Sequence, residues 1–425
     1  MRYMTLSDWE SDIRVAQAAH IDGFALNIAA HDDSNDASLD RAFKAANKLN
    51  FSLFFSFDYV AHGPWPADRV IALLKKHTGH RSYFRHNKDA PLVSTFEGPG
   101  NAGDWPGIKA ATNAFLLPSW SSRPPAEAVA LAGGVADGLF NFGAWPNGAS
   151  NMTTDTDASF QAALSSSSPP NQYNRPPKPY MMPVSPWFFT NLPGFGNKNW
   201  LWRGDELWDV RWAQVAERQP EYVQILSWND FGESHYIGPL WEKQMGLFEA
   251  GRAPVNYARG MPHDGWRRFL GFYVGVYKTG QVPQRIGRGG EGVVVYYRTA
   301  PALACWSGGT TGNVAGHGDQ VEMPPHEVLE DEVFFSVLLD SDEGVWVAVE
   351  IGGRVVKGRF NRAPAAGRGT PGVYTGSVPF GGNTGDVVVT VWRHGRVVAA
   401  ARGGKGISTK CENNVQNWNA VVASG

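Results

Sequence analysis

The sequence lacks several features that would define other classes of protein. It contains no stretch of about 18 apolar residues that could span a membrane, and no apolar run follows residues 1–3, as a secretion signal would require. Lys plus Arg number 38 against 40 Asp plus Glu, so no excess of positive charge is available to hold a nucleic acid. We therefore expect neither a membrane nor a nucleic-acid partner, and we expect a monomer.

Motifs of several enzyme classes are also missing. No Gly-x-Gly-x-x-Gly phosphate loop follows the first predicted strands, and the chain has no Gly-x-Ser-x-Gly nucleophile and no His-Glu-x-x-His zinc motif. The 11 histidines are scattered without the spacing of metal ligands. Neither a metal nor a cofactor is predicted.

Cysteine is scarce. The two residues, Cys305 and Cys411, lack the paired spacing of a zinc site. We predict a disulfide between them, which would close a loop of about a hundred residues and stabilise the fold by roughly 4 kcal/mol in an oxidising compartment. Two unlinked, buried thiols are the alternative.

Tryptophan, by contrast, is abundant, with 17 residues in 425. An indole ring stacks on the C–H face of a sugar, while Asn, Asp and His side chains can bind the sugar hydroxyls. Together with a net charge of only −2, this composition favours a neutral carbohydrate partner. Any single Trp, however, is more often a core residue.

Residues 1–236 alternate short apolar runs with helical patterns, which is typical of a repeated βα unit. Helix starts are predicted after Ser7, in a capping box with Glu10, after Ser38 and at Pro66, and a further helix is predicted at residues 207–218. Seven strands are predicted, at residues 21–29, 51–59, 91–97, 113–120, 138–145, 179–188 and 222–228.

Eight such strands close a TIM-type (β/α)8 barrel. The missing strand should precede Thr5, so we expect the first barrel strand to be truncated, displaced or supplied by another segment. A doubly wound open sheet is the alternative architecture. The Ser/Pro-rich residues 165–179 predict a long loop.

The pattern changes near residues 282–290. A helix at residues 265–277 is predicted to pack outside the barrel, and β-rich runs with glycine-rich turns follow it, which indicates an antiparallel β-sandwich. We therefore predict two domains, residues 1–284 and 285–425. The sandwich strands are predicted at residues 292–297, 333–339, 345–351 and 387–392.

Polar residues that end the predicted strands are the candidates for chemistry, because the reacting groups of a barrel lie at the C-terminal ends of its strands. Asp230 and Glu233 are the strongest pair. Cleavage of a glycoside needs one protonated and one ionised carboxyl group, and neighbouring carboxyls push each other's pKa values apart. A D-x-x-E pattern alone is common on solvated surfaces.

Asp58 and Glu97 also end strongly apolar strands, where an unpartnered carboxylate is costly to bury. Asn27 and His31 could bind substrate or merely cap the next helix. The complete set predicted to bind substrate is Asn27, His31, Tyr59, Glu97, Trp120, Trp145, Trp187, Trp228, Asn229, His235 and Tyr236.

Three passages resemble fungal α-1,3-glucanases (mutanases) of glycoside hydrolase family 71. They are residues 5–28, residues 51–59 (FSLFFSFDY) and above all residues 180–236, which include YMMPVSPWFF and WNDFGES. The resemblance extends to CENNVQNWN around Cys411 and covers nearly the whole chain.

The resemblance implies an endo-acting, inverting hydrolysis of α-1,3-glucan by a (β/α)8 barrel followed by a β-sandwich, without a metal. We assign Glu233 as the general acid and Asp230 as the general base, with Asp58 as a further acid of the site. A secreted or cell-wall location is also implied, although such enzymes are expected to have a strand and a secretion signal before residue 5. A catalytically impaired protein that binds cell-wall glucan is the alternative function.

Overall fold

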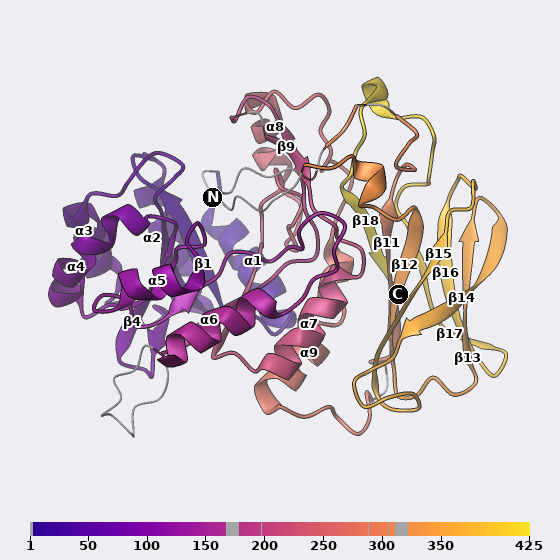
Figure 1. The fold of residues 1–425 in the computed structure, drawn as a ribbon, viewed down its shortest axis with the longest axis horizontal. Helices are drawn as coiled ribbons and strands as arrows, with labels where there is room; N and C mark the ends of the chain where they lie inside the picture. Colours follow the sequence, from indigo (N-terminus) through magenta and orange to yellow (C-terminus); the bar gives the residue numbers. More distant parts are fainter. Residues whose placement is uncertain are drawn as a thin grey trace.

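The structure is a computed structural model that describes residues 3–166, 178–196, 198–287, 289–305, 307–309, 311 and 322–425. The chain passes from a part built of helices and short parallel strands into a large antiparallel sheet (Figure 1). Most of the loop predicted at residues 165–179 lies outside the described residues. None of the described helices is long and apolar enough to cross a membrane.

Parallel strands form the centre of the first part, and all seven predicted strands are confirmed, although some are shorter than expected. One parallel run consists of β1 (Gly23–Ala29), β2 (Ser52–Asp58), β4 (Ala90–Phe96) and β5 (Phe115–Ser119). A second run consists of β6 (Leu139–Phe140), β7 (Tyr180–Val184) and β10 (Tyr222–Ile225). Backbone N–H groups of Asp137 and Gly138 donate to Leu116 and link the two runs.

The two ends of this series meet through side chains. Residues 3–5, where the first barrel strand was expected to end, contain no strand. Instead, Phe24 of β1 packs on Trp228, which follows β10, with ring centroids 5.0 Å apart. The described residues therefore provide seven parallel strands, one fewer than the eight that close a TIM-type barrel.

Helices precede, separate and follow the parallel strands along the chain. These are α1 (Leu6–Ala18), α2 (Asn35–Leu49), α3 (Ala67–His77), α4 (Trp105–Thr112), α5 (Pro125–Ala132), α6 (Asp155–Ser166), α7 (Leu207–Arg218), α8 (Gly246–Ala250) and α9 (Leu270–Thr279). Short elements between them are β3 (Arg85–His86), the hairpin β8 (Phe189–Leu192) and β9 (Lys198–Leu201), and 3-10 turns η1 (Pro99–Asp104), η2 (Glu242–Gln244) and η3 (Asp264–Arg267).

Two of the predicted helix starts are wrong. Thr5, not Ser7, caps α1, because its backbone N–H donates to the Asp8 carboxylate at 2.6 Å while its hydroxyl accepts from the Asp8 backbone at 3.3 Å. Helix α2 begins at Asn35, so Ser38 is a buried residue within the helix rather than its cap.

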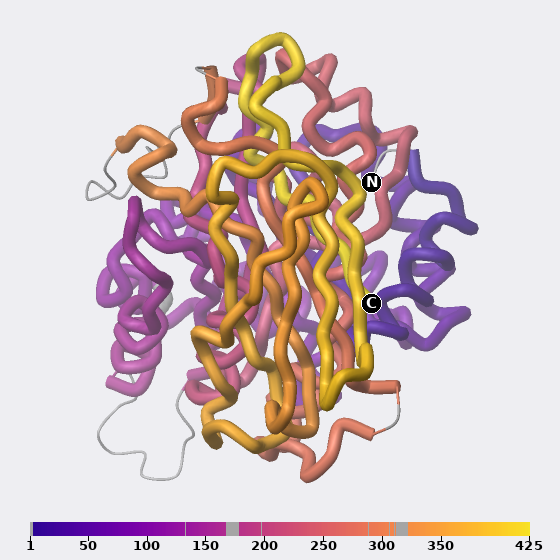
Figure 2. Tube along the Cα trace, turned by 90° about the vertical axis from the view of Figure 1, so that its right-hand side faces the viewer, coloured from indigo at the N-terminus to yellow at the C-terminus, as the bar shows by residue number. Residues whose placement is uncertain are grey.

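The antiparallel sheet follows α9. Its strands are β11 (Gly292–Arg298), β12 (Glu332–Leu339), β13 (Val345–Ile351), β14 (Arg354–Arg362), β15 (Gly372–Pro379), β16 (Val387–Arg393), β17 (Arg396–Arg402) and β18 (Ala420–Ser424). They are paired in the order β17-β16-β13-β14-β15-β12-β11-β18. Figure 2 shows this sheet in front of the rest of the chain.

The sheet bends so that both of its halves contribute to one core. Strands β15, β12, β11 and β18 form the first half, and strands β17, β16, β13 and β14 form the second half. Val295 and Phe335 from one half and Val349 and Val389 from the other belong to the same buried cluster. The opposite face of β11, β12 and β18 packs on the first part of the chain, where Tyr296 lies 4.6 Å from Trp266, centroid to centroid. The first half of the sheet is thus covered on both faces.

Buried polar contacts also join the sheet to the first part. Asp209 of α7 accepts hydrogen bonds from Ser336 of β12 at 2.6 Å and from the Tyr273 hydroxyl. Arg298 of β11 pairs with Asp205 at 2.6 Å, and both side chains are almost fully buried. These contacts fix the position of the sheet relative to α7.

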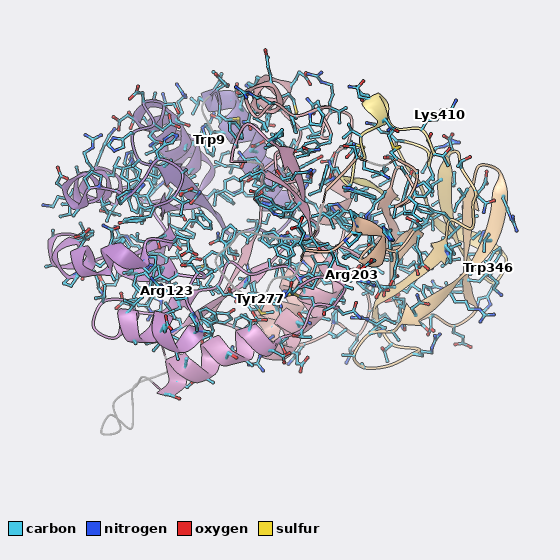
Figure 3. All side chains as sticks on the ribbon, turned by 45° about the horizontal axis from the view of Figure 1, so that its top comes forward. Trp9, Arg123, Arg203, Tyr277, Trp346 and Lys410 are labelled. Atoms are coloured by element: carbon cyan, nitrogen blue, oxygen red, sulfur yellow. A yellow bond between two sulfur atoms is a disulfide. The ribbon has the colours of Figure 1, made fainter. Side chains whose placement is uncertain are left out.

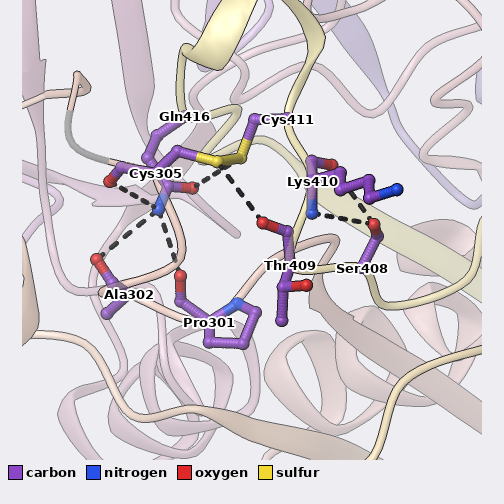
Figure 4. Close-up of a disulfide and its surroundings, with 8 residues drawn as sticks. All are labelled: Pro301, Ala302, Cys305, Ser408, Thr409, Lys410, Cys411 and Gln416. Carbon is purple, nitrogen blue, oxygen red and sulfur yellow. Dashed lines mark hydrogen bonds between the residues drawn. A yellow bond between two sulfur atoms is a disulfide. The ribbon is translucent and has the colours of Figure 1, made fainter.

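The predicted disulfide is confirmed. Cys305 and Cys411 are bonded to each other (Figure 4), which rules out the alternative of two unlinked thiols. Next to the bond, the Gln416 amide donates to the carbonyl oxygens of Pro301 and Cys305 at 3.1 and 3.3 Å. The covalent link and this amide together hold the segment before β18 against the segment after β11.

Candidate active site

The segment after β10 carries the predicted acid pair, and backbone hydrogen bonds close it into a tight loop. Ser227 donates to the carbonyl of His235 at 2.8 Å and accepts from Ile237 at 2.9 Å. The Tyr257 hydroxyl donates to the carbonyl of Gly232 at 2.6 Å. Because both the ends and the middle of the loop are bonded, its two acids have little freedom to move.

Asp230 and Glu233 converge within this loop. The Glu233 backbone N–H donates to Asp230 Oδ1 at 2.9 Å, and the Asp230 N–H donates to Ser227 Oγ at 2.9 Å. One carboxylate oxygen of each acid and one ring nitrogen of His235 all lie within 4.8 Å of one another. The structure therefore brings together the two acids that the sequence singled out.

Glu233 has two cationic or hydrogen-bonding neighbours. Lys198 Nζ lies 2.6 Å from Oε1, and His235 Nε2 lies 3.0 Å from Oε2, while His235 Nδ1 lies 2.9 Å from Ser227 Oγ. Burial acts to raise the pKa of Glu233, but the bond to His235 and the charge of Lys198 outweigh it and lower the pKa to about 2.

Asp230 has the opposite shift. Burial and the negative charge of Glu233 raise the pKa of Asp230 above its ordinary value. The pKa values of the two acids therefore differ, with the ionised carboxylate on Glu233 and the higher proton affinity on Asp230.

Asp58 lies at the end of β2, and its charge acts on the same ammonium group. Burial lowers the pKa of Lys198, but the charges of Glu233, Asp230 and Asp58 raise it overall. The Asp58 carboxylate accepts from the backbone of Val60 at 2.8 Å and from the Asn27 amide at 3.2 Å. The charges of three predicted acids thus act on Lys198, and the Asn27 amide holds the carboxylate of Asp58.

Trp145 lies close to this cluster, whereas the Trp228 ring turns toward Asp12 of α1. The Trp145 ring is 5.4 Å from the His235 ring, centroid to centroid, and its indole N–H donates to the Trp187 carbonyl at 2.9 Å. The Trp228 indole donates to Asp12 at 3.0 Å. Both rings are only partly buried, so both can take part in binding a ligand.

Three predicted substrate-binding residues are instead core residues. Trp120, Trp187 and Tyr236 are at most 1% exposed. Trp187 lies 4.5 Å from the Arg298 guanidinium, and the Tyr236 ring stacks on His263 at 3.9 Å. We therefore correct their assignment, because a polysaccharide cannot reach these side chains from solvent in this conformation.

The remaining predicted residues, Glu97, Tyr59, His31 and Asn229, do not belong to the acid cluster. Glu97 accepts hydrogen bonds from the backbone N–H, at 2.8 Å, and the hydroxyl of Ser122, which ties the end of β4 to the loop after β5. Tyr59 is buried against Gly98, where a Cβ atom would lie 2.5 Å from its ring. His31 is exposed and Asn229 is partly exposed.

Sequence reasoning missed Lys198 and Asp12. Lys198 lies 35 residues before its partner Glu233 and on a different element, β9; its only signal was its position within the passage that carries the family resemblance. Asp12 accepts from the indole N–H groups of Trp228 and Trp241, each at 3.0 Å. Burial raises the pKa of Asp12 to about 6.

Asp230, Glu233 and His235 could also offer three ligands to a metal ion. Lys198 argues against that use, because its ammonium group already neutralises Glu233 and would repel a cation bound next to it. A cavity of about 230 Å³ lies elsewhere, beside the disulfide, where Asn256, Thr299 and Lys405 contribute to its lining. The acid cluster is therefore the better candidate for catalysis.

A carboxylate pair after the last parallel strand, flanked by aromatic rings, is the arrangement of a glycoside hydrolase. The family model described as Glycosyl hydrolase family 71 matches residues 1–425. The chain belongs to this family.

Two relatives are similar over nearly the whole chain. A protein named mutanase from Penicillium rubens is 31% identical over 425 residues, which cover 99% of this chain and 85% of the relative. The glucan endo-1,3-alpha-glucosidase agn1 of Schizosaccharomyces pombe is 30% identical, with 98% of this chain and 90% of the relative covered.

Two further similarities are more partial. An ascus wall endo-1,3-alpha-glucanase of the same yeast is 32% identical over 55% of this chain and 54% of its own length. Among solved structures, the GH99 endo-alpha-mannosidase from Bacteroides thetaiotaomicron matches 65% of this chain and 80% of its own, at 15% identity and a TM-score of 0.46. That structural likeness is too distant to carry an inference about function.

Proposed function

We propose that this protein is an endo-acting hydrolase of α-1,3-glucan and that Asp230 and Glu233 are its catalytic pair. The convergence of these two acids around Lys198 and His235 is the observation that carries the proposal. The substrate is inferred from the names of the two relatives that are similar over nearly the whole chain. A secreted or cell-wall location fits the disulfide, since such bonds persist in oxidising compartments.

The proposal extends to the architecture. The seven parallel strands and their helices would form a (β/α)8-type barrel, with residues 1–284 as the catalytic domain and residues 285–425 as a β-sandwich domain. The order of the parallel strands and the position of the acids beyond their C-terminal ends support this arrangement.

Asp230 is proposed as the general acid and Glu233 as its ionised partner, which reverses the order assigned from the sequence. Lys198 and His235 stabilise the Glu233 anion through direct contacts at 2.6 and 3.0 Å. Among the described residues no such cation contacts Asp230, which lies next to a negative charge, so the proton needed by the leaving oxygen is held there.

The anomer released first shows whether hydrolysis inverts or retains the configuration of the sugar, and this tests the roles of the acids. Inverting enzymes separate their carboxyl groups by roughly 6.5–9.5 Å to admit water, whereas retaining enzymes use roughly 5–5.5 Å. Oxygens of Asp230 and Glu233 lie within 4.8 Å of each other, so inversion requires water held by a more distant carboxylate, and Asp58 is the candidate. Proton NMR should detect the β-anomer first; an initial α-anomer would assign a nucleophilic role within the close pair.

Activity is tested with purified protein on insoluble α-1,3-glucan, with α-1,4-glucan and β-1,3-glucan as controls. We expect release of reducing sugar from α-1,3-glucan alone, and we expect Glu233→Gln to abolish it while binding to the polymer remains. Binding without hydrolysis by the unmodified protein would favour the alternative, a glucan-binding protein. Unchanged activity of Glu233→Gln would remove this residue from the mechanism.

Asp230 is tested separately with substrates of different leaving-group ability. Asp230→Asn should be severely slowed on α-1,3-linked oligosaccharides but much less on an activated aryl glycoside, whose leaving group needs no proton. The same pattern in Glu233→Gln, and not in Asp230→Asn, would restore the order of roles assigned from the sequence.

A further inference from the structure

Two tryptophans face outward together on the antiparallel sheet, far from the acid pair in sequence. Trp346 of β13 and Trp392 of β16 are directly opposite each other in register, and their rings are parallel within 6° at a centroid distance of 5.6 Å. Trp346 is 37% exposed. Figure 3 places it at the outer end of the sheet, away from Trp9 and Arg123 of the first part.

The strand alternation explains why these rings are outside. In β13, Val347 and Val349 point into the shared core, so Trp346 and Ala348 between them point to the other face. This half of the sheet, β13, β14, β16 and β17, has an outer face that the described chain does not cover, unlike the outer face of β11 and β12.

The tryptophans belong to an ordered row. Val397 of β17, which is 51% exposed, pairs with Trp392, and Trp392 pairs with Trp346. The next row along the sheet has small side chains, Ala400, Thr390, Ala348, followed by Lys357. A raised aromatic ridge therefore stands beside a low, flat strip with a hydrogen-bonding side chain at its edge.

A cross-strand aromatic pair also stabilises a sheet, by roughly 0.2–1 kcal/mol, so the pair alone could be structural. That role does not require exposed apolar neighbours. Val355 of β14, on the same face, is 60% exposed, and an exposed apolar surface with a polar rim is typical of a binding site.

We propose that Trp346 and Trp392 form a second, non-catalytic binding site for a neutral polysaccharide chain. Parallel indole rings match the C–H faces of pyranose units, and the flanking polar side chains can bind hydroxyl groups. That the polymer is the enzyme's own α-1,3-glucan rests on the proposed function.

Charge argues against a second copy of this chain as the occupant. Lys357 and Arg359 of β14 lie on the exposed side of the sheet against the acid Glu350 of β13, whereas Arg402 of β17 is already paired with Asp386 at 3.2 Å. Two such faces brought together would place like charges opposite each other, whereas a neutral polymer meets no repulsion.

The test measures retention on insoluble α-1,3-glucan in the Glu233→Gln background, so that the polymer is not consumed. Trp346→Ala and Trp392→Ala should each weaken binding about tenfold, and the double variant should abolish retention apart from that of the active site. Trp346→Tyr, which keeps a ring, should bind nearly as well as its parent. The control is Leu303→Ala, which removes another highly exposed apolar side chain and should change nothing.

Activity of the same substitutions in the unmodified active site separates this inference from the proposed function. Hydrolysis of soluble α-1,3-oligosaccharides should be unchanged, while hydrolysis of the insoluble polymer falls. If no α-1,3-glucan is hydrolysed but Trp346-dependent retention on α-1,3-glucan, cellulose or chitin persists, the proposed function fails and the binding site stands.

Other outcomes would overturn the inference. Equal retention of Trp346→Ala and its parent would show that the rings do not bind the polymer. Binding abolished by 0.5 M salt would indicate an anionic ligand instead, because contacts with a neutral sugar are not screened. A dimer lost in Trp346→Ala would identify the face as a self-interface, and a lowered melting temperature with unchanged retention would leave only a structural role.

Discussion

At the scale of the residue, the contact between Lys198 and Glu233 controls the charge state of the acid pair. Glu233 has a lowered pKa of about 2 and Asp230 a raised one, so the active form exists between these two values. Activity should fall at low pH when Glu233 takes up a proton, and at high pH when Asp230 loses one.

Lys198→Met is predicted to move both limbs of the pH profile of kcat/KM to higher pH. The ammonium lowers the pKa of Glu233 and of Asp230, so its removal raises both values, and the rate at the parent's optimum should drop roughly tenfold. The control is Lys278→Met, which removes a lysine from the exposed ion pair with Asp22. A lower rate with an unshifted profile would mean that Lys198 has no electrostatic role.

The acid pair was predictable because its members are three residues apart and end a strand. Lys198 was not, because an ion pair between residues 35 positions apart leaves no pattern in local sequence. Trp187 and Tyr236 show a related limit. A position at a strand end gives the location of a side chain but not its direction, and both of these rings turn into the junction with the antiparallel sheet.

At the scale of the element, α7 is the helix on which the antiparallel sheet is anchored. Its bounds and the seven parallel strands were predicted, since long apolar periodicity is the most reliable sequence pattern. The hairpin of β8 and β9 was missed, because its two short strands, FTNL and KNWL, mix polar and apolar residues and form no apolar run. That hairpin carries Lys198, so the missed element and the missed residue have one cause.

Asp209→Ala is predicted to destabilise this junction by about 2–4 kcal/mol. The substitution would leave the buried hydroxyls of Tyr273 and Ser336 without their acceptor. The free energy of unfolding, measured by chemical denaturation, should fall by this amount, whereas Asp40→Ala, which breaks an exposed ion pair with Lys76, should change it by less than about 1 kcal/mol. Similar small effects of both substitutions would contradict the role given to Asp209.

At the scale of the whole molecule, the disulfide constrains the unfolded chain. Cys305 and Cys411 are 106 residues apart, and closure of a loop of this size is worth about 4–5 kcal/mol in the chain-entropy model. The double variant Cys305→Ser/Cys411→Ser should therefore unfold at a lower denaturant concentration than the oxidised protein, and a reducing agent should affect only the latter. Equal midpoints for the two proteins would show that the bond is neutral.

The core shared by the two parts has a consequence for how the molecule comes apart. Tyr296 and Phe334 of the antiparallel sheet belong to the same buried cluster as Trp208 and Trp266 of the first part. A chain ended after residue 284 would expose those rings to water, so we expect the parallel-strand part to lose stability without the sheet. Calorimetry should show one cooperative transition, and the melting of the sheet and the loss of hydrolytic activity should coincide in temperature.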